Sequence, residues 1–525
     1  MRSFIAQCCL AGITEWVVCP GARDMALLQQ LSSCPDLTVW THFDERSAAF
    51  FALGRIQDTG LPVAVVTTSG TAAAELYPAV IEAYYEGRPL VLITADRPVE
   101  FRGSGAPQAI EQAELFGIYS QMIDIEDPSD IPNTLIEDSW DYRSPLHINI
   151  CLPEPKIDGP LPEADFYPEA PPELEYPRPS LANLAQNLRN KSYRDGLVLA
   201  IGGLDPNEQD PALWLAQELK APVIADATSG IRESLSSLTL IDADRIFKSN
   251  PPSTVLRLGD VPVGRFWRDL EDMPNTEVFS ITRTGFSGLA RPSTVIYGQL
   301  EDIIQALGDI SPVGDPLDLL KSARKSSGVI EDALVSLERS EPALVRAFSQ
   351  FAALGDYLFL GNSNSIRLWN AYAQRLMATE NVRANRGANG IDGELSTFLG
   401  GSVRMRDSWA LVGDLTALYD ANALAMTAQL PEGRRVIGVL NNTGGGIFKR
   451  LPQASQFSPA MERMLIQPHS ADFSHLAQLW SATYLRIESA DDTEQLDGLP
   501  ESGTFLVELV PDAQQTEQFY ARLAR

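Results

Sequence analysis

Residues 408–448 have the sequence SWALVGDLTALYDANALAMTAQLPEGRRVIGVLNNTGGGIF, which contains two short apolar runs, each followed by a polar pair. The run WALV ends in Gly413-Asp414, and the run VIGVL ends in Asn441-Asn442 before three glycines. Continuous apolar runs of this length are typical of strands buried on both faces of a parallel sheet. The carboxyl ends of parallel strands lie at one edge of the sheet, where ligands bind in open α/β folds. The stretch therefore predicts a ligand site at such an edge.

The two polar pairs contain oxygen atoms that suit a hard metal ion. A carboxylate from Asp414 and an amide oxygen from the Asn441-Asn442 pair are ligands that Mg²⁺ accepts, and Mg²⁺ usually keeps phosphate and water in its shell. The three glycines allow the backbone to approach a ligand closely, and a helix N-terminus beyond them favours a phosphate. Together, the two strand ends predict a metal–diphosphate site.

The rest of the chain alternates apolar runs with amphipathic stretches, a pattern that predicts βαβ units and parallel sheets. We expect strands at 13–19, 61–67, 89–94 and 146–152, then at 197–202, 222–226, 254–258, 277–281 and 294–297, and finally at 357–360, 409–412, 436–440 and 505–509. Stretches rich in proline and acidic residues separate these three groups. The prediction is three doubly wound parallel-sheet α/β domains, over 1–155, 181–310 and 341–525, joined by linkers over 156–180 and 311–340.

The composition excludes several classes of protein. Lysine and arginine number 41 against 69 acidic residues, for a net charge of −28, so we expect no sequence-independent binding to nucleic acid. Such a charge also repels small anions unless local arginines reverse the field. The 5 cysteines form no CxxC pair and the 4 histidines are dispersed, so neither a disulfide framework nor a zinc site is expected. No long apolar stretch or cleavable leader is evident, and we expect a cytoplasmic protein without a membrane span.

The order of the two polar pairs resembles the signature of thiamine-diphosphate-dependent enzymes. In that family the aspartate, the second asparagine and the backbone carbonyl two residues later bind Mg²⁺, or Mn²⁺ in its place. The resemblance therefore implies Asp414, Asn442 and Gly444 as metal ligands. It implies that the cofactor also contacts their neighbours, which are Gly413, Leu415, Thr416, Ile447 and Phe448.

The same resemblance implies two further residues that act on the cofactor. In the segment THFDERSAAFFALG, Glu45 follows a predicted strand and begins a helix rich in small residues. The family glutamate at this place hydrogen-bonds N1′ of the aminopyrimidine and favours the tautomer that deprotonates the thiazolium. Ile391, in GANGIDG, occupies the place of the aliphatic residue that supports the bent shape of the cofactor.

Longer motifs resemble a narrower family, the 2-succinyl-5-enolpyruvyl-6-hydroxy-3-cyclohexene-1-carboxylate synthases of menaquinone or phylloquinone biosynthesis. They are HFDERSAAFFALG, TTSGTAAAELYPAVIEA, LITADRP, GNSNSIR and NRGANGIDG. The resemblance implies decarboxylation of 2-oxoglutarate and a 1,4-addition of the succinyl semialdehyde unit to isochorismate. Both substrates are dicarboxylates, which arginine forks bind well. The residues implied in substrate binding are Arg23, Arg97, Gln108, Arg265, Ser363, Arg367 and Arg386.

The chain departs from the family pattern at three places near these residues. Ala22 stands in PGARD where the family has serine, Pro107 replaces an asparagine before Gln108, and Gly264 replaces a basic residue before Arg265. All three bear on how the substrate is held, and none touches the cofactor residues. Two alternatives to the synthase remain: another thiamine-dependent 2-oxoacid decarboxylase or carboligase, and a non-catalytic acidic α/β protein with a retired thiamine fold.

The resemblance also implies an assembly. In the family, 1–155 corresponds to the pyrimidine-binding domain, 181–310 to the central domain and 341–525 to the diphosphate-binding domain. Two chains contribute opposite halves of each cofactor site, so we expect a homodimer or a homotetramer with interchain active sites.

Overall fold

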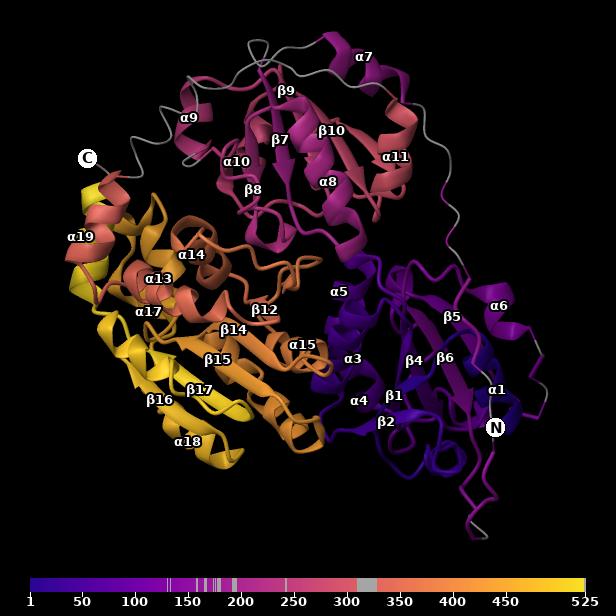
Figure 1. Ribbon diagram of the computed structural model, residues 1–525. Coiled ribbons are helices and arrows are strands. Elements are labelled where there is room, and N and C mark those ends of the chain that lie inside the picture. Colours follow the sequence, from indigo (N-terminus) through magenta and orange to yellow (C-terminus); the bar gives the residue numbers. More distant parts are fainter. Residues whose placement is uncertain are drawn as a thin grey trace. The chain divides into compact units, whose positions relative to one another are not determined.

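The computed structural model (Figure 1) describes residues 1–129, 131–132, 134–156, 159–164, 168–172, 174, 176, 181–190, 196–240, 243–308 and 328–523. These residues form three parallel β-sheets with helices packed against them, which confirms the predicted fold class. They group into two compact units, unit 1 with Met1–Glu175, Gly387–Arg404 and Leu418–Pro431, and unit 2 with Tyr176–Arg386, Met405–Ala417 and Glu432–Arg525. The predicted domain boundaries remain predictions. Residues 311–327 of the 311–340 linker, and several positions in the 156–180 linker, lie outside the described residues.

Unit 1 contains a six-stranded sheet in the order β2-β1-β3-β4-β6-β5. Its strands are β1 (Glu15–Cys19), β2 (Thr38–Thr41), β3 (Val63–Thr67), β4 (Leu90–Asp96), β5 (Gln121–Ile125) and β6 (Leu146–Cys151). Its helices are α1 (Arg2–Leu10), α2 (Met25–Leu31), α3 (Glu45–Thr59), α4 (Thr71–Glu75), α5 (Tyr77–Glu86), α6 (Leu135–Ser139) and α15 (Glu394–Gly401), with short 3-10 helices η1 (Val99–Phe101), η2 (Gly117–Tyr119) and η6 (Ala421–Gln429). Helices α1, α2 and α6 share a core with one face of the sheet, and α3 contacts β1 and β3.

Helix α3 owes its small residues to close packing against α15 (Figure 1). A Cβ on Gly54 would lie 2.0 Å from the carbonyl oxygen of Thr397, and one on Gly400 would lie 2.1 Å from that of Phe51. Only glycine lets the two backbones approach this closely. A buried carboxylate, Asp420, reinforces the contact by accepting hydrogen bonds from Ser47 Oγ at 3.1 Å and from the Ser396 amide at 2.7 Å.

Unit 2 contains a five-stranded sheet in the order β11-β10-β9-β7-β8. Its strands are β7 (Leu197–Ile201), β8 (Val223–Ala225), β9 (Thr254–Leu258), β10 (Glu277–Thr282) and β11 (Thr294–Tyr297). The helices in this part of the chain are α7 (Ala182–Asn190), α8 (Pro206–Leu219), α9 (Ala243–Ser249), α10 (Arg265–Asp269) and α11 (Leu300–Leu307), with η4 (Ala227–Ser229) and η5 (Leu270–Asp272). Helices α8 and α11 share a core with one sheet face, and α9 and α10 with the other, as a doubly wound sheet requires.

The second sheet of unit 2 has the order β13-β12-β14-β15-β17-β16. Its strands are β12 (Tyr357–Leu360), β13 (Val382–Arg383), β14 (Asp407–Gly413), β15 (Arg434–Leu440), β16 (Thr483–Ile487) and β17 (Gly503–Leu509). The helices are α13 (Glu341–Ala352), α14 (Asn364–Tyr372), α16 (Asp414–Tyr419), α17 (Pro459–Ile466), α18 (Phe473–Leu479) and α19 (Ala513–Leu523), with η7 (Gly446–Arg450), η8 (Ala454–Gln456) and η9 (Asp491–Leu496). The strand order reverses between β12 and β14, so the crevice expected for a ligand lies at the ends of these strands.

The predicted strands overlap observed ones, and four observed strands were not predicted: β2, β5, β13 and β16. All four lie at sheet edges. β2 and β16 each have a single buried residue, so their sequences lack the continuous apolar run by which the inner strands were recognised. β13 has two residues, too few for such a run.

Candidate functional site

The carboxylate of Asp414 lies at the end of β14, where α16 begins. It is buried, with an exposed fraction of 3%. Its Oδ1 accepts a hydrogen bond from the Leu415 amide at 2.7 Å, and its Oδ2 accepts one from the Gly444 amide at 2.8 Å. His469 Nε2 lies 3.2 Å from Oδ2. Burial raises the pKa of Asp414. The structure thus joins Asp414 and Gly444, which the sequence placed at two different strand ends.

The two asparagines after β15 differ in their hydrogen bonds. Asn441 uses both ends of its amide: Nδ2 donates to Glu508 Oε1 at 2.6 Å, and Oδ1 accepts from the Thr443 amide at 3.0 Å. Asn442 donates from Nδ2 to Glu341 Oε1 at 2.6 Å, but its buried Oδ1 has no hydrogen-bond partner among the described residues. A buried acceptor without a partner is costly and calls for a missing ligand or water. Asn442, not Asn441, therefore has the oxygen available to a metal.

The glycines after Asn442 form a narrow turn that no larger residue could replace. Gly444 has φ 129°, and a Cβ there would lie 2.3 Å from the carbonyl oxygen of Ile466. A Cβ on Gly446 would lie 2.7 Å from Asn442 Nδ2. The turn leads directly into η7, which contains Ile447 and Phe448.

These groups fit a hard divalent cation with a diphosphate. One buried carboxylate, one unpartnered amide oxygen and the Gly444 backbone carbonyl are all oxygen ligands, and they leave room in an octahedral shell for phosphate and water. In the part of the chain that the structure describes, no group of three histidine, cysteine or acidic side chains lies close enough to hold a metal, so a zinc-type site is not an alternative there. The cofactor neighbours Gly413, Leu415 and Thr416 lie on the same strand end and first turn of α16.

Glu45 is the first residue of α3 and lies in unit 1. The helix is capped by Asp44, which accepts a hydrogen bond from the Ser47 amide at 3.1 Å. Burial raises the pKa of Glu45, and the nearby charges of Asp44 and Glu75 raise it further. A carboxyl group with a raised pKa is suited to exchanging a proton near neutral pH.

The segment that contains Ile391 packs on the same helix α3. A Cβ on Gly393 would lie 1.9 Å from the Phe50 ring, so the turn before α15 lies directly against α3. Glu82 of α5 fixes the start of this segment, because its two carboxylate oxygens accept from the amides of Gly387 at 2.6 Å and Ala388 at 2.7 Å. Burial and the neighbouring Glu86 hold the pKa of Glu82 well above its usual value.

The three other predicted residues of unit 1 lie in loops after its strands. Arg23 is buried, and it donates to the Leu152 carbonyl at 3.1 Å and to Glu154 at 2.9 Å. The guanidinium of Arg97 lies over the Phe101 ring, 5.3 Å from its centroid. Gln108 has φ 55° and its Cα would lie 3.1 Å from a Cβ on Gly70. Among the described residues, no hydrogen bond or ion pair joins these three side chains, and Arg23 is already engaged by an exposed glutamate.

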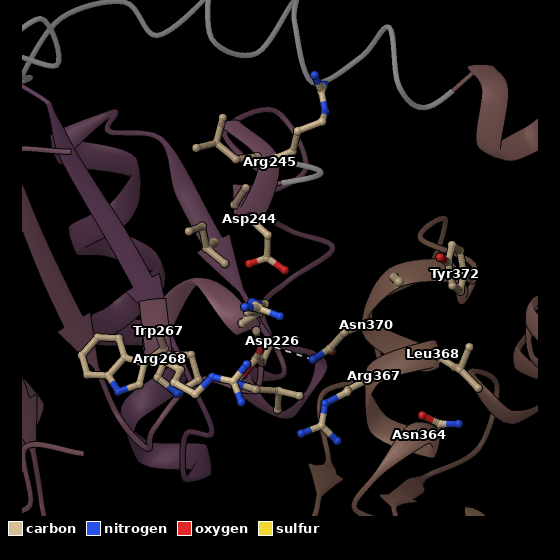
Figure 2. A pocket seen from close by; sticks show the side chains of 18 of the residues that line it. Asp226, Asp244, Arg245, Trp267, Arg268, Asn364, Arg367, Leu368, Asn370 and Tyr372 are labelled. Atoms are coloured by element: carbon tan, nitrogen blue, oxygen red, sulfur yellow. Dashed lines mark hydrogen bonds between the residues drawn. The ribbon is translucent and has the colours of Figure 1, made fainter. Parts of the chain in front are cut away.

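Four predicted residues of unit 2 line one cavity of about 1360 Å³: Arg265, Arg367, Arg386 and Ile447. Figure 2 shows Arg367 at this cavity. Arg386 donates to Asn362 Oδ1 at 2.7 Å, and Arg367 donates to the Ser363 carbonyl. Burial lowers the pKa of Arg367, the charges of Arg386 and Arg268 lower it further, and the charge of Asp226 opposes them. Ser363 itself has φ 64° at the start of α14 and does not line the cavity.

Arg268 lines the same cavity, and the sequence reasoning missed it. It extends from α10 toward Asp226 (Figure 2), and among the described residues it has no ion-pair partner. Arg265 is exposed, as Arg268 is, but it pairs with Asp269 at 3.2 Å. Arg268 follows Arg265 by less than one helical turn, so the two side chains are neighbours on the helix. This spacing could have indicated Arg268 from the sequence. Glu341 and His469 were also missed, because they reach Asn442 and Asp414 from distant parts of the chain.

Comparison with known proteins identifies relatives over the whole length. The chain is 62% identical over 524 residues to the 2-succinyl-5-enolpyruvyl-6-hydroxy-3-cyclohexene-1-carboxylate synthase of Akkermansia muciniphila, covering 100% of this chain and 98% of the relative. It is 33% identical to the synthase of the same name from Bdellovibrio bacteriovorus, covering 97% and 95%. Residues 1–115 match the family described as the N-terminal TPP binding domain of thiamine pyrophosphate enzymes.

A solved structure supports the fold separately. The benzoylformate decarboxylase from Polynucleobacter necessarius superposes with a TM-score of 0.71, covering 97% of this chain and 98% of that chain at 15% sequence identity. At this identity the likeness shows the fold alone. Among the helices of the described residues, none is long and apolar enough to cross a membrane.

Proposed function

This chain belongs to the family of 2-succinyl-5-enolpyruvyl-6-hydroxy-3-cyclohexene-1-carboxylate synthases, and on that basis we propose that it decarboxylates 2-oxoglutarate and adds the remaining succinyl semialdehyde unit to isochorismate. The observation on which this rests is the 62% identity to a synthase over its whole length. The enzyme depends on thiamine diphosphate and a divalent metal, Mg²⁺ or Mn²⁺, and acts in menaquinone or phylloquinone biosynthesis.

Different residues of the chain have different roles in this reaction. Thiamine diphosphate, when bound, supplies the nucleophilic carbon and the electron sink that loss of CO₂ from a 2-oxo acid requires. Asp414, Asn442 and the Gly444 carbonyl hold the metal that binds the diphosphate. Glu45 exchanges the proton of the aminopyrimidine. Ile391 would support the cofactor, and Ile447 and Phe448 would form an apolar wall beside it.

The cavity arginines bind the substrate carboxylates. Arg268 and Arg386 lie close enough to Arg367 for their charges to lower its pKa, although Asp226, which lines the same cavity, acts in the opposite direction. Arg265 lies at the rim. Arg23, Arg97, Gln108 and Ser363 add contacts from the loops after their strands. A dicarboxylate is the ligand that most directly neutralises such a group.

We also propose that the enzyme works as a homodimer or a homotetramer, in the cytoplasm. The pyrimidine-binding domain over 1–155 of one chain and the diphosphate-binding domain over 341–525 of a second chain build each site, with the central domain over 181–310 between them in the sequence. This arrangement rests on the family resemblance. A mixture of variants that are defective in opposite halves of the site tests it.

The function itself is tested by one assay with 2-oxoglutarate, isochorismate, thiamine diphosphate and Mg²⁺, followed by mass analysis of the product. We expect 2-oxoglutarate to be consumed only when isochorismate is present, and the product mass to equal their sum less CO₂. Release of free succinyl semialdehyde without use of isochorismate would instead identify a simple decarboxylase. No consumption at all would point to a retired thiamine fold.

Loss of Arg386 or Arg268 is expected to weaken substrate binding selectively. Each removes a charge-assisted contact, so Arg386→Ala and Arg268→Ala should each lower kcat/KM by about 10- to 100-fold, mainly through KM. Affinity for thiamine diphosphate should stay within about threefold of the wild type. The measurement is steady-state kinetics for both substrates beside a cofactor titration.

The matched control is Arg522→Ala, since Arg522 lines the same cavity but donates to Ser336 Oγ at 2.6 Å. We expect its kinetics to resemble those of the wild type. If Arg386→Ala lost the cofactor and not the substrate, these arginines would not be substrate ligands.

A further inference from the structure

We propose that Glu341 is a positioning residue for the metal, because it holds the Asn442 amide with its oxygen free to act as a ligand; this inference rests on the proposed function. Glu341 begins α13, and its carboxylate has an exposed fraction of 2%. Its Oε1 accepts from Asn442 Nδ2 at 2.6 Å, and its Oε2 accepts from Arg450. The contact between Glu341 and Asn442 spans 101 positions of the chain.

An ionised carboxylate decides which way an asparagine amide faces. It can only accept hydrogen bonds, so the asparagine must turn its NH₂ toward it and its oxygen away. In the opposite orientation the amide oxygen would face the carboxylate, which is repulsive in a buried place. Glu341 therefore leaves Asn442 Oδ1 unpaired, and that atom is buried and without a partner among the described residues.

The neighbouring asparagine shows that the unpaired oxygen is specific to position 442. Asn441 donates to a buried carboxylate of its own, Glu508, at the same distance of 2.6 Å. Its oxygen is nevertheless engaged, because it accepts from the Thr443 amide. Two adjacent asparagines thus share one kind of carboxylate partner, and only one of them keeps a free ligand atom.

Arg450 engages the second carboxylate oxygen of Glu341, so one oxygen accepts from Arg450 and the other accepts from Asn442. The guanidinium of Arg450 pairs with Glu341 and lies over the Tyr520 ring, 3.9 Å from its centroid. Arg450 ends η7, the segment with Ile447 and Phe448, so the same carboxylate also fixes the apolar wall to α13.

The test uses an isosteric change, Glu341→Gln, which should leave the packing intact. Arginine has no acceptor, so Arg450 will take the glutamine oxygen and turn its NH₂ toward Asn442. Asn442 must then use its oxygen to accept from the glutamine, and the metal loses a ligand. We expect the affinity for Mn²⁺ in the presence of thiamine diphosphate to fall by about 10- to 100-fold, as for other partners of metal ligands. Titration followed by electron paramagnetic resonance measures it without turnover.

A rescue variant separates this orientation effect from a general structural role. In Glu341→Gln/Arg450→Met, no arginine competes for the glutamine oxygen, which is free to accept from Asn442 again. We expect this double variant to regain most of the Mn²⁺ affinity. If Glu341 only tied α13 to the turn, removing Arg450 as well would weaken binding further, and that result would overturn the inference.

Glu508→Gln is the matched control, because it changes the equivalent partner of Asn441. Its Mn²⁺ affinity should stay within about threefold of the wild type. An equal loss in both single variants, or an unchanged affinity in Glu341→Gln, would refute the role of Glu341. The proposed function fails separately, if thiamine diphosphate does not enhance Mn²⁺ binding to the wild-type protein at all.

Discussion

Replacement of Glu45 by glutamine is expected to lower kcat by about 10²- to 10⁴-fold while thiamine diphosphate and Mg²⁺ still bind. Glutamine keeps the size of the side chain and its position at the start of α3, so the fold should not change. It cannot exchange a proton with the aminopyrimidine, which is the role proposed for Glu45. The measurement is product formation at saturating substrates, beside a fluorescence titration with thiamine diphosphate.

The raised pKa of Glu45 is the physical reason to expect a large effect. Burial disfavours the charged carboxylate, and the negative charges of Asp44 and Glu75 act in the same direction. The carboxyl group therefore takes up a proton at a higher pH than an ordinary glutamate, closer to the range in which it can exchange one during turnover.

Glu75→Gln is the control for Glu45→Gln. Glu75 is an exposed carboxylate near enough to influence Glu45, but it has no proposed contact with the cofactor. We expect this variant to keep most of its activity. Near-normal turnover in Glu45→Gln would show that another group supplies the proton.

The inner strands could be predicted because each is buried on both faces. The runs before Asp414 and Asn441 are continuous apolar segments, and β14 and β15 are almost wholly buried. The same physics explains the failures at the sheet edges. Strands such as β2 and β16 have one unpaired side and several exposed residues, so nothing in their sequences distinguishes them from loops.

In the candidate site too, some residues could be predicted from the sequence and others could not. Local patterns pointed to Asp414, the Asn441-Asn442 pair and the glycines after it, because strand ends and glycine runs have recognisable sequences, and the family resemblance then selected Asn442 and Gly444. The partners of these residues are not local. Glu341 reaches Asn442 across 101 positions of the chain, and Glu82 reaches Gly387 across 305. In the sequence, each of these acids looks like an ordinary helix glutamate. Only the folded chain shows that they are buried and engaged.

The distribution of charge, too, could be seen only in the structure. The net charge of −28 suggests a protein that repels anions. The cavity of unit 2 nevertheless collects arginines from α10, α14 and the loop before α15, among them Arg268, Arg367 and Arg386. Because charges separated by more than about 10 Å are screened in salt, this local group governs anion binding and the distant acids do not. The excess acid therefore argues against sequence-independent binding to nucleic acid, but it does not exclude dicarboxylate substrates.

Removal of the metal carboxylate is expected to have the second large effect. Asp414→Ala deletes a buried charged ligand, and such a loss costs about 3–5 kcal/mol of binding free energy when its partner stays buried. We therefore expect Mg²⁺-dependent binding of thiamine diphosphate, and with it all activity, to fall below detection. The titration used for Glu45→Gln measures this, and the melting temperature checks that the protein still folds although the Gly444 amide loses its acceptor.

Mixing the two inactive variants tests whether each site is built by two chains. In a mixed dimer of Glu45→Gln and Asp414→Ala chains, one site carries both defects and the other carries neither. Random exchange of an equal mixture should then restore about a quarter of the wild-type activity, because half of the dimers are mixed and each has one intact site of two. If Glu45 and Asp414 of the same chain shared a site, every site would keep one defect and the mixture would stay inactive. Recovery that grows with time after mixing, and is absent in each variant alone, would therefore establish the interchain site.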